Sequence, residues 1–559
     1  MKYLVIIYIL VFLPLISPAI QAGDVYHNYR SLFYVNPPAS EIKLRTRKVG
    51  VREAYLIAGE SRKRMKKVYS DKEFDYFVAS SVPMDSGFSY YFLVLGTADT
   101  LRCPETGEFK PGVPHFTTPS WANGKIYYSI FPDGFYNGDP TNDPKKKLKW
   151  GERPKKWDPY GGDLKGITEK LSYIDSLGPD IILLQPIFSA NSNHKLNPKD
   201  YATIDPHFGD TTDLKRLISE IHKRNKKIVL SVTFTHTGTD FPTFSDIMKN
   251  GKESKYINWY QIGSTPIKTS PPNYRCWRSD HRFPCLDLNN PQVKNYLIGY
   301  LEYWKHFGFD GFYIGEDTTI TADFARTLRE NLKRRYPDLL LLGSAPQLIG
   351  GNGFDGCYNS SITKLLRDYF INNTITTSDF NDRLQKWFFF SLPQVKGINL
   401  IKVSTYDQRI YKENFNKIKL LYVFLLTAIG SPVIMYGDEI GASGCEPLNP
   451  GSFNWNKNEQ NTLLFEEVKR LIKIRKSTPQ LQGDKFFTLY INDITKVYAY
   501  DRGGVIIVLN CGGRESFVEL PAWDGVYLDL MSGEKVTAYS QRLRLSVDSG
   551  AYRILKREI

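Results

Sequence analysis

The sequence is poor in cysteine and in long apolar segments. Only six of its 559 residues are cysteines, and none of them has the spacing of a zinc site. After residue 22 no segment resembles a membrane span, and no nucleic-acid-binding motif accompanies the basic residues. These absences argue against a zinc module, an integral membrane protein and a nucleic-acid-binding protein.

Acidic residues are also in deficit. The chain has 73 Lys and Arg against 59 Asp and Glu, which gives a formal net charge of +14. The densest basic runs are SRKRMKKVYS (Ser61 to Ser70) and Lys145 to Lys147, and they favour solvated faces over one binding patch for an acidic partner. Aromatic residues make up 14% of the chain. Because aromatic faces stack on sugar rings, this content suits a carbohydrate binder, although large cores use the same residues.

The N-terminus predicts a signal peptide over residues 1–22. Lys2 precedes an apolar stretch from Tyr3 to Ile16, and Ala19 to Ala22 supplies small residues for cleavage. An uncleaved membrane anchor is the alternative, but Pro14 and Pro18 favour cleavage. We therefore expect a secreted or periplasmic protein.

Disulfides are permitted in that compartment. Cys276 and Cys285 lie nine positions apart in a proline-containing loop, so we predict a bridge between them. The other four cysteines cannot be paired from the sequence.

Three structural regions are expected after the signal peptide. Short runs rich in Tyr, Phe and Val predict a β-sandwich over residues 23–118, which ends in a Pro/Thr-rich connector. Residues 119–481 predict an α/β region with an inserted subdomain at 237–290. Strand-like runs return after it and predict a C-terminal β-sandwich over residues 482–559.

The central region predicts a (β/α)8 TIM barrel. Eight short apolar runs alternate with segments of helical periodicity, such as Asp213 to Lys227, and this alternation is typical of the barrel. A barrel would place an active site at the C-terminal ends of its strands. The eight runs are KIYYSIF (from Lys125), DIILLQP (from Asp180), KIVLSVT (from Lys227), GFDGFYIG (from Gly308), LLLLGSA (from Leu339), GFDGCYN (from Gly353), INLIKVS (from Ile398) and SPVIMYG (from Ser431).

Five motifs in this order give the chain a family resemblance. They are IFPDGFYNGDPTND, YGGDLKGI, LQPIFSANSNHK, DYATIDPHFGD and MYGDEIG. Together they resemble the α-amylase family of glycoside hydrolases, in particular the group of neopullulanases, cyclomaltodextrinases and maltogenic amylases. The resemblance covers nearly the whole chain from about Val25 and implies a carbohydrate-active TIM barrel.

The resemblance also implies that the catalytic carboxylates are replaced. Retaining hydrolysis needs two carboxyl groups about 5 Å apart, one as nucleophile and one as acid/base. The motif GFDGFYIG places Gly315 at the family's nucleophile position and Tyr313 at its arginine position, and LLGSAP places Ser344 at the acid/base position. The third family carboxylate is retained as Asp407, but Tyr406 stands where a histidine is usual.

The third-strand motif is altered in the same way. SVTFTH carries Ser231 and Thr235 where the family has Asp and Asn, and only His236 is retained. Leu196 replaces the family's stacking tyrosine. Rescue by Glu316 is disfavoured, because successive strand residues point to opposite sides.

A calcium site is implied by two further segments. Asn137, Asp139, Asn142 and Asp143 match the first segment of the group's calcium site, and Gly161, through its carbonyl, and Asp163 match the second. Their oxygens suit a hard cation with six to eight ligands. The alternative is an Asx-rich loop that caps itself.

These observations give one leading function and two alternatives. The leading hypothesis is a secreted, catalytically inactive protein that binds an α-glucan or maltooligosaccharide, with Trp259, Trp277 and Tyr406 as candidate sugar contacts and a starch-binding-like N-terminal domain. The first alternative is a protein-interaction scaffold that partners an enzyme or a membrane complex, by fold-level analogy. The second is a residual or altered α-glucan hydrolase that uses Asp407, His236 or Glu316. The resemblance also implies a homodimer formed through the N-terminal domain.

Overall fold

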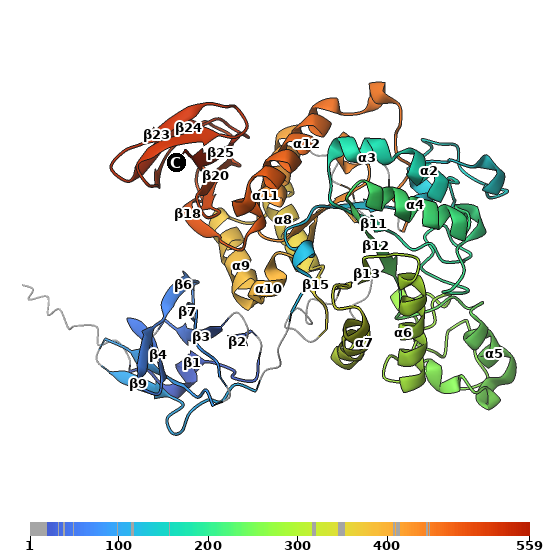
Figure 1. The fold of residues 1–559 in the computed structure, drawn as a ribbon, viewed down its shortest axis with the longest axis horizontal. Helices are drawn as coiled ribbons and strands as arrows, with labels where there is room; N and C mark the ends of the chain where they lie inside the picture. The colour runs from blue at the N-terminus through green and yellow to red at the C-terminus, as the bar shows by residue number, and fades with distance from the viewer. Residues whose placement is uncertain are drawn as a thin grey trace, which may run out of the picture. The chain divides into compact units, whose positions relative to one another are not determined.

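The structure is a computed structural model that describes residues 19–558, except for 32, 37–39, 49, 86, 98, 113–116, 156, 316–319, 345–352, 406–408, 410–413, 443–444 and 447. Most of the predicted signal peptide therefore lies outside the described residues. The chain divides into two compact units, Met1–His115 and Phe116–Ile559, each with its own core (Figure 1). We describe each unit by itself.

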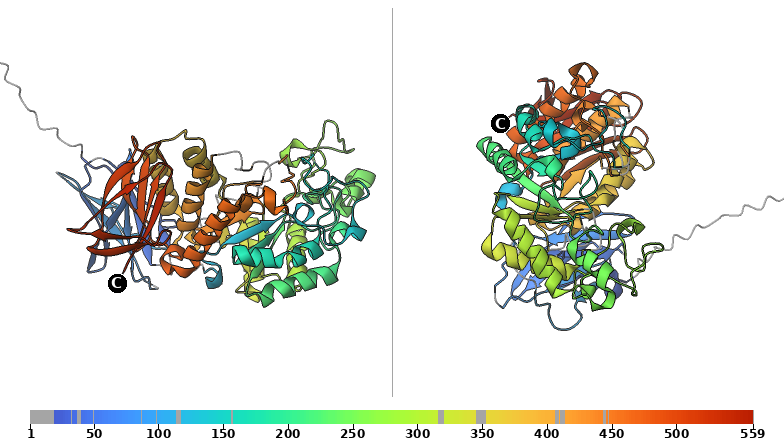
Figure 2. Two further views of the ribbon diagram at one scale, coloured as in Figure 1. Left: turned by 90° about the horizontal axis from the view of Figure 1, so that it is seen from above. Right: turned by 90° about the vertical axis from the view of Figure 1, so that its right-hand side faces the viewer.

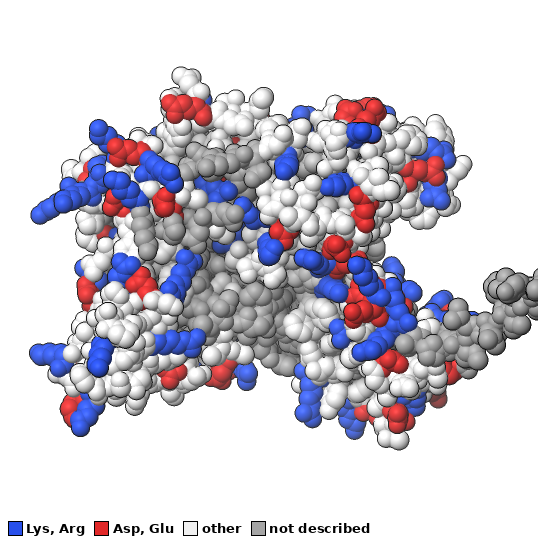
Figure 3. Space-filling view, turned by 180° about the vertical axis from the view of Figure 1, so that it is seen from behind, with Lys and Arg blue, Asp and Glu red and all other residues white. Residues whose placement is uncertain are grey.

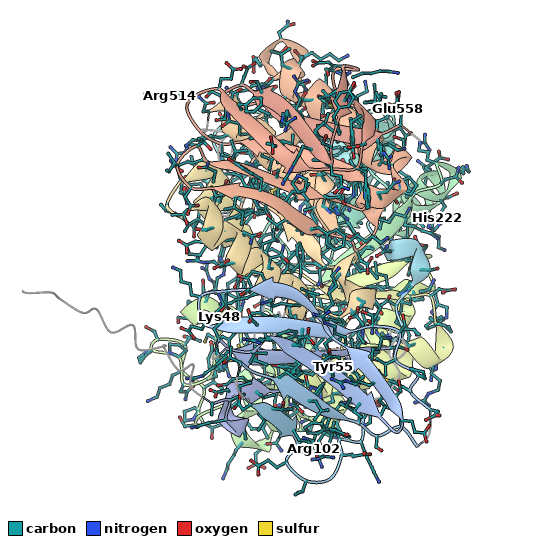
Figure 4. The ribbon with its side chains drawn as sticks, turned by 90° about the vertical axis from the view of Figure 1, so that its left-hand side faces the viewer. Lys48, Tyr55, Arg102, His222, Arg514 and Glu558 are labelled. Carbon is teal, nitrogen blue, oxygen red and sulfur yellow. The ribbon has the colours of Figure 1, made fainter. Side chains whose placement is uncertain are left out.

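The N-terminal unit is a sandwich of two antiparallel sheets, as predicted. One sheet has the order β1-β3-β7-β6 with β2 paired to β3, and the other has the order β5-β4-β8-β9. Residues such as Leu44, Phe77 and Phe92 alternate inward along their strands and form the core between the sheets. Figure 4 labels Lys48, Tyr55 and Arg102 in this unit. The strands are β1 (Val25–Tyr26), β2 (Val35–Asn36), β3 (Glu41–Arg47), β4 (Glu53–Ala58), β5 (Ser61–Arg64), β6 (Lys66–Ser70), β7 (Phe74–Ala79), β8 (Tyr91–Leu95) and β9 (Thr100–Cys103).

The second unit contains the predicted parallel barrel. All eight apolar runs form strands, in the order β15-β14-β13-β12-β11-β10-β17-β16. An isolated parallel bridge between Tyr358 and Leu400 joins the two end strands and closes the barrel. The strands are β10 (Tyr127–Ile130), β11 (Ile181–Leu184), β12 (Lys227–Val232), β13 (Gly311–Ile314), β14 (Leu340–Gly343), β15 (Gly356–Cys357), β16 (Leu400–Lys402) and β17 (Ser431–Met435).

Amphipathic helices connect the strands. Helix α4 shows why these segments are helical. Its apolar residues recur at helical spacing and all are buried, as the sequence predicted; they are Leu214, Leu217, Ile218 and Ile221. Each such side chain contributes about 1.5–3 kcal/mol when it leaves water. The helices are α1 (Pro132–Phe135), α2 (Leu164–Glu169), α3 (Leu171–Leu177), α4 (Thr211–Lys223), α5 (Pro242–Asn250), α6 (Pro291–Lys305), α7 (Ala322–Arg335), α8 (Ser360–Leu366), α9 (Thr377–Phe390), α10 (Pro393–Lys396), α11 (Phe415–Thr427), α12 (Thr462–Ser477) and α13 (Pro479–Gln482).

The predicted disulfide is wrong. Cys276 is a free thiol whose Sγ donates to the Tyr274 carbonyl at 3.3 Å. In the hairpin of the inserted segment, Cys276 lies directly opposite Pro284, while the Cys285 amide donates to the Arg275 carbonyl at 2.9 Å. Because neighbouring strand residues point to opposite faces, this register directs the two cysteine side chains to different sides.

The C-terminal residues form the predicted antiparallel β-structure. A six-stranded sheet has the order β18-β19-β20-β25-β22-β23, and β21 and β24 form a second sheet. Helix α9 of the barrel contacts β18, for example through a hydrogen bond that Gln385 Nε2 donates to Thr488 Oγ1 at 3.0 Å. Figure 2 shows the red C-terminal strands beside the gold helices. The strands are β18 (Phe487–Asn492), β19 (Val497–Asp501), β20 (Val505–Asn510), β21 (Ser516–Pro521), β22 (Gly525–Asp529), β23 (Lys535–Ala538), β24 (Arg542–Val547) and β25 (Tyr552–Arg557).

Two buried arginines lie where the barrel meets the C-terminal strands. The Arg475 guanidinium donates to the carbonyls of Leu426, Ala428 and Gly430, at 3.0, 3.1 and 2.6 Å. The Arg502 guanidinium donates to the Thr427 carbonyl and to carbonyls of the connecting segment before β18. Burial lowers the pKa of Arg475 to about 9 and that of Arg502 to about 10. Backbone carbonyls of the barrel thus hold both side chains.

The surface carries its positive charge in a dispersed form. On the face seen in Figure 3, basic and acidic side chains are interspersed. Within the described part of the chain, no helix is both long enough and apolar enough to cross a membrane.

Candidate functional site

The residues predicted to occupy the catalytic positions meet at the ends of neighbouring strands. Ser231 of β12 pairs with Tyr313 of β13 in the parallel register. Gly315 follows β13 and donates its amide to the Val232 carbonyl at 3.1 Å, and Ser344 follows β14 and donates to the Ile314 carbonyl at 3.2 Å. These are the C-terminal ends of the strands, where barrels carry their functional residues. None of Ser231, Tyr313, Gly315 and Ser344 supplies a carboxylate.

Tyr313 fills the space beside Gly315. A Cβ atom added to Gly315 would lie 2.5 Å from Tyr313 Cε1 and 3.0 Å from its Cδ1, which is well inside van der Waals contact. The tyrosine is 2% exposed and packs in the barrel core with Leu183, Leu342 and Val433. An arginine at this position would place a charge here, whereas the tyrosine ring adds apolar bulk.

The described residues at this level of the barrel enclose a small cavity. Its volume is about 20 Å³, which is roughly the space of one water molecule. Tyr313, Lys402, Ser129, Gln185 and Tyr358 contribute to its lining. The Lys402 ammonium lies 4.0 Å from the Tyr358 ring centroid. This cavity is therefore too small for a sugar ring.

His236 is covered by an aromatic cluster. Its ring stacks on Trp277, with centroids 4.7 Å apart and planes at 19°, and meets Phe283 edge-on at 5.4 Å. Leu196 and Trp157 pack in the same cluster. His236 is 0% exposed, so a general acid or base role would require these rings to move. Burial also lowers the pKa of the nearby His194 well below its usual range.

The two described candidates for sugar stacking are also largely buried. Trp277 is 7% exposed, and Trp259 is 8% exposed with its Nε1 donating to Gln292 at 2.9 Å. Contact of either ring with a glucan stays a prediction that needs the ring to be uncovered. The other predicted residues, Tyr406 and Asp407, lie outside the described residues, as does Glu316.

Two fully buried carboxyl groups stand near the first and last strands. Asp133 accepts the backbone amides of Tyr160 and Gly161 at 3.0 Å, and burial raises its pKa to about 6. Glu439 accepts the hydroxyls of Tyr128 and Tyr173 at 2.7 Å each, and burial raises its pKa to about 7. Both groups hold loops together.

The predicted calcium ligands are gathered in one loop region after β10. Asn137 Nδ2 donates to Asp143 Oδ1 at 2.7 Å, and a Cβ on Gly161 would lie 2.3 Å from that same oxygen. Gly161 has a φ of 86°, so this close approach requires glycine. Asp163 Oδ2 accepts the amides of residues 138 and 139, and the short helix that ends at Asn142 is capped by Asp139.

The chemistry of this loop fits a hard cation. The Oδ1 atoms of Asn137 and Asn142 are buried without a hydrogen-bond partner, although buried polar atoms are normally satisfied. Asp143 and Asp139 add carboxylates, and Lys147 pairs with Asp143 at 2.6 Å. Amide, carboxylate and carbonyl oxygens are the ligands of calcium. In the described chain no three His, Cys, Asp or Glu side chains cluster as a metal site, so any site here depends on the asparagine and backbone oxygens.

Some residues of the site region were missed from the sequence. Lys402 follows Leu400 at strand spacing, and both line the barrel cavity. This i, i+2 alternation in INLIKVS was the available signal. A separate aromatic groove that includes Trp150 and Trp455 had no such signal, because its residues are about 300 positions apart.

Comparisons with known proteins agree with this architecture. Residues 129–338 match the model "Alpha amylase, catalytic domain", and residues 21–118 match "Alpha amylase, N-terminal ig-like domain". A cyclomaltodextrinase of Thermoanaerobacter pseudethanolicus is 33% identical over an alignment of 496 residues, and the match covers 83% of this chain and 86% of that protein. A maltogenic α-amylase of Bacillus acidopullulyticus is 33% identical over an alignment of 518 residues, and the match covers 84% of this chain and 88% of that protein. The chain belongs to the α-amylase family.

A solved structure places the fold more closely. The structure of a cyclomaltodextrinase superposes with a TM-score of 0.88 at 26% identity and covers 96% of this chain and 100% of its own. A neopullulanase of Thermoactinomyces vulgaris is 32% identical over an alignment of 515 residues, and the match covers 86% of this chain and 88% of that protein. Together these relatives define the group. Within the family, this chain falls among the cyclomaltodextrinases, maltogenic amylases and neopullulanases.

Proposed function

We propose that this protein binds α-glucans without hydrolysing them. The proposal rests on one observation: Gly315 and Ser344 lie at the ends of two neighbouring strands, and the Tyr313 ring fills the space beside Gly315. Glycine has no side chain to attack the anomeric carbon, and a serine hydroxyl is a poor proton donor near neutral pH. General acid catalysis alone contributes about 10²–10⁴-fold, and the loss of the nucleophile adds further orders of magnitude.

A second candidate is α-glucan hydrolysis by altered chemistry. The observation that favours it is the set of relatives, whose names describe cyclomaltodextrinases and a maltogenic amylase. Such an enzyme would have to use Asp407, Glu316 or an uncovered His236. Turnover of an activated aryl maltoside, which needs little acid assistance, tests for it.

The experiment is a calorimetric titration with maltoheptaose and β-cyclodextrin, combined with an assay for new reducing ends in the same samples. We expect heat of binding and no new reducing ends. Reducing ends that appear in proportion to protein, and that disappear in the Asp407→Asn variant, would replace the proposal with the second candidate. If the titration gives no heat and the assay finds no new reducing ends, both candidate functions are contradicted. The protein-interaction scaffold would then be the remaining hypothesis.

The loss of activity should not be reversed by two carboxylates alone. Gly315→Asp with Ser344→Glu leaves the Tyr313 ring where the Cβ atom of the introduced side chain must lie, so we expect this double variant to be inactive on aryl maltosides. Adding Tyr313→Arg frees that space and restores the family's charge. Turnover by the double variant at the level of the triple variant would show that Tyr313 is no obstacle.

We also propose that the loop after β10 binds calcium and that the protein is secreted. Asn137, Asn142 and Asp143, with Asp139, Asp163 and the Gly161 carbonyl, would hold the ion, whose role would be to fix the loop by satisfying its buried oxygens. Secretion rests on the leader-like sequence of residues 1–22. Sequencing the N-terminus of the exported protein tests it, with Gly23 as the expected first residue.

A further inference from the structure

An aromatic groove lies on the loops that follow β10 and β17. Its volume is about 540 Å³, within the range of small-molecule sites. We call it the aromatic groove and define it by Tyr136, Lys147, Lys149, Trp150, Tyr160 and Trp455. It shares no lining residue with the small cavity inside the barrel. The groove is therefore separate from the barrel cavity, although Asn137 of the predicted calcium loop also lines it.

The indole rings of the groove are held in fixed positions. Trp150 Nε1 donates to the Phe453 carbonyl, and Trp455 Nε1 donates to the Phe135 carbonyl, each at 2.6 Å. Turning either ring would break its hydrogen bond to the backbone, and both side chains remain partly exposed. A rigid aromatic surface binds with little loss of side-chain freedom. Such a surface suits a ligand with flat apolar faces, as a glucose ring has.

The polar groups of the groove suit a neutral ligand with many hydroxyls. No carboxylate lines it. The Lys147 ammonium pairs with Asp143 at 2.6 Å, whereas no described acid lies within ion-pair distance of Lys149. Lys149 can therefore donate to hydroxyl oxygens. A second ammonium, that of Lys170, lies 3.8 Å from the Tyr136 ring centroid and 4.6 Å from that of Trp455. Two such groups do not give the concentrated charge that an anionic polymer requires.

We propose that the aromatic groove, rather than the barrel cavity, is where this chain holds an α-glucan. The inference rests on the proposed function and adds the location of the binding site. The barrel cavity has room for about one water molecule, while the groove has the volume, the rings and the donor for a short oligosaccharide. Glucan binding would thus not depend on that cavity.

Calorimetric titration of maltoheptaose into variants of the full chain tests this. We expect Trp150→Ala and Tyr136→Ala to bind about tenfold more weakly than the wild type. Lys149→Ala removes only an exposed side chain, so it keeps the test valid if a tryptophan variant fails to fold, and we expect weaker binding there too. Trp523→Ala is the matched control, because this C-terminal tryptophan is 72% exposed and lies outside the groove.

The outcomes separate the inference from the proposed function. If the wild type binds maltoheptaose and the groove variants bind equally well, the inference is overturned and the proposed function stands. Weaker binding in Lys402→Ala alone would place the glucan in the barrel and overturn the inference in the same way. If the wild type gives no heat with maltoheptaose, the proposed function and the inference both fail.

Discussion

Adding one carbon atom at Gly315 should destabilise the barrel. In Gly315→Ala the new Cβ would lie 2.5 Å from Tyr313 Cε1, about 1 Å closer than ordinary contact. Tyr313 is 2% exposed and packed among core side chains, so it cannot swing away freely. Overpacking of this kind costs about 1–3 kcal/mol.

Thermal unfolding by calorimetry measures this cost. A domain of the barrel's size loses roughly 0.8 kcal/mol of stability per kelvin near its Tm, so the expected decrease in Tm is about 1–4 °C. Gly299→Ala is the matched control, since it makes the same change in helix α6 of the same barrel with no atom within 4 Å. There we expect no loss and a gain of up to about 1 kcal/mol from helix propensity.

A second substitution identifies the cause of the loss. In a Tyr313→Leu background the ring edge is gone, so Gly315→Ala should lower Tm by much less than in the wild type. The difference between the two backgrounds is a coupling energy of about 0.5–3 kcal/mol. An equal decrease in both backgrounds would show that Tyr313 is not what excludes a side chain at 315, and the steric reasoning would be refuted.

Three further predictions concern Glu439, the predicted calcium loop and Cys276. Burial raises the pKa of Glu439 to about 7, so near neutral pH the folded protein holds a proton that the unfolded chain has released. Lowering the pH from about 8 to 4.5 should therefore add about 3 kcal/mol of stability. Measuring Tm against pH should show this rise in the wild type and its loss in Glu439→Gln. Calcium should raise Tm and a chelator should reverse the rise, whereas Asn142→Ala should abolish the calcium response and the exposed Asn458→Ala should keep it. Because no bridge joins Cys276 to Cys285, a reductant should leave Tm unchanged. Mass spectrometry should find Cys276 alkylated in the native protein. An intact disulfide-linked peptide would contradict this.

The barrel could be predicted because its signals are local. Each apolar run is short and flanked by helical periodicity, as in the run from Lys227 that becomes β12. Burial of both faces of a parallel strand leaves an almost continuous apolar sequence, so the strand is visible without knowledge of its neighbours. The same holds for α4, whose buried positions follow from spacing alone.

The disulfide could not be predicted in this way. Nine-residue spacing permits a hairpin, but the bond depends on which residues face each other. Pairing of Cys276 with Pro284 leaves Cys285 one position out of register. A shift of one residue reverses the face of a side chain, and the sequence does not specify that shift.

The chemistry of the site was predictable only in part. The absence of carboxylates at 315 and 344 is visible in the motifs, whereas the packing of Tyr313 against Gly315 is not, because it depends on a rotamer in the core. The aromatic groove was hidden for another reason. Trp150 and Trp455 follow different barrel strands, and only the closed barrel brings them together.

The two buried arginines have a consequence for how the molecule unfolds. Arg475 belongs to the last long helix of the barrel and Arg502 to the C-terminal strands, yet both donate to carbonyls in the same short segment, residues 426–430. Separating the two regions would break the bond from Arg502 to the Thr427 carbonyl and leave both buried groups without that partner, at a cost of about 1–3 kcal/mol or more. The barrel and the C-terminal strands should therefore melt in one cooperative transition, and protease nicking near residue 484 should require global rather than local opening.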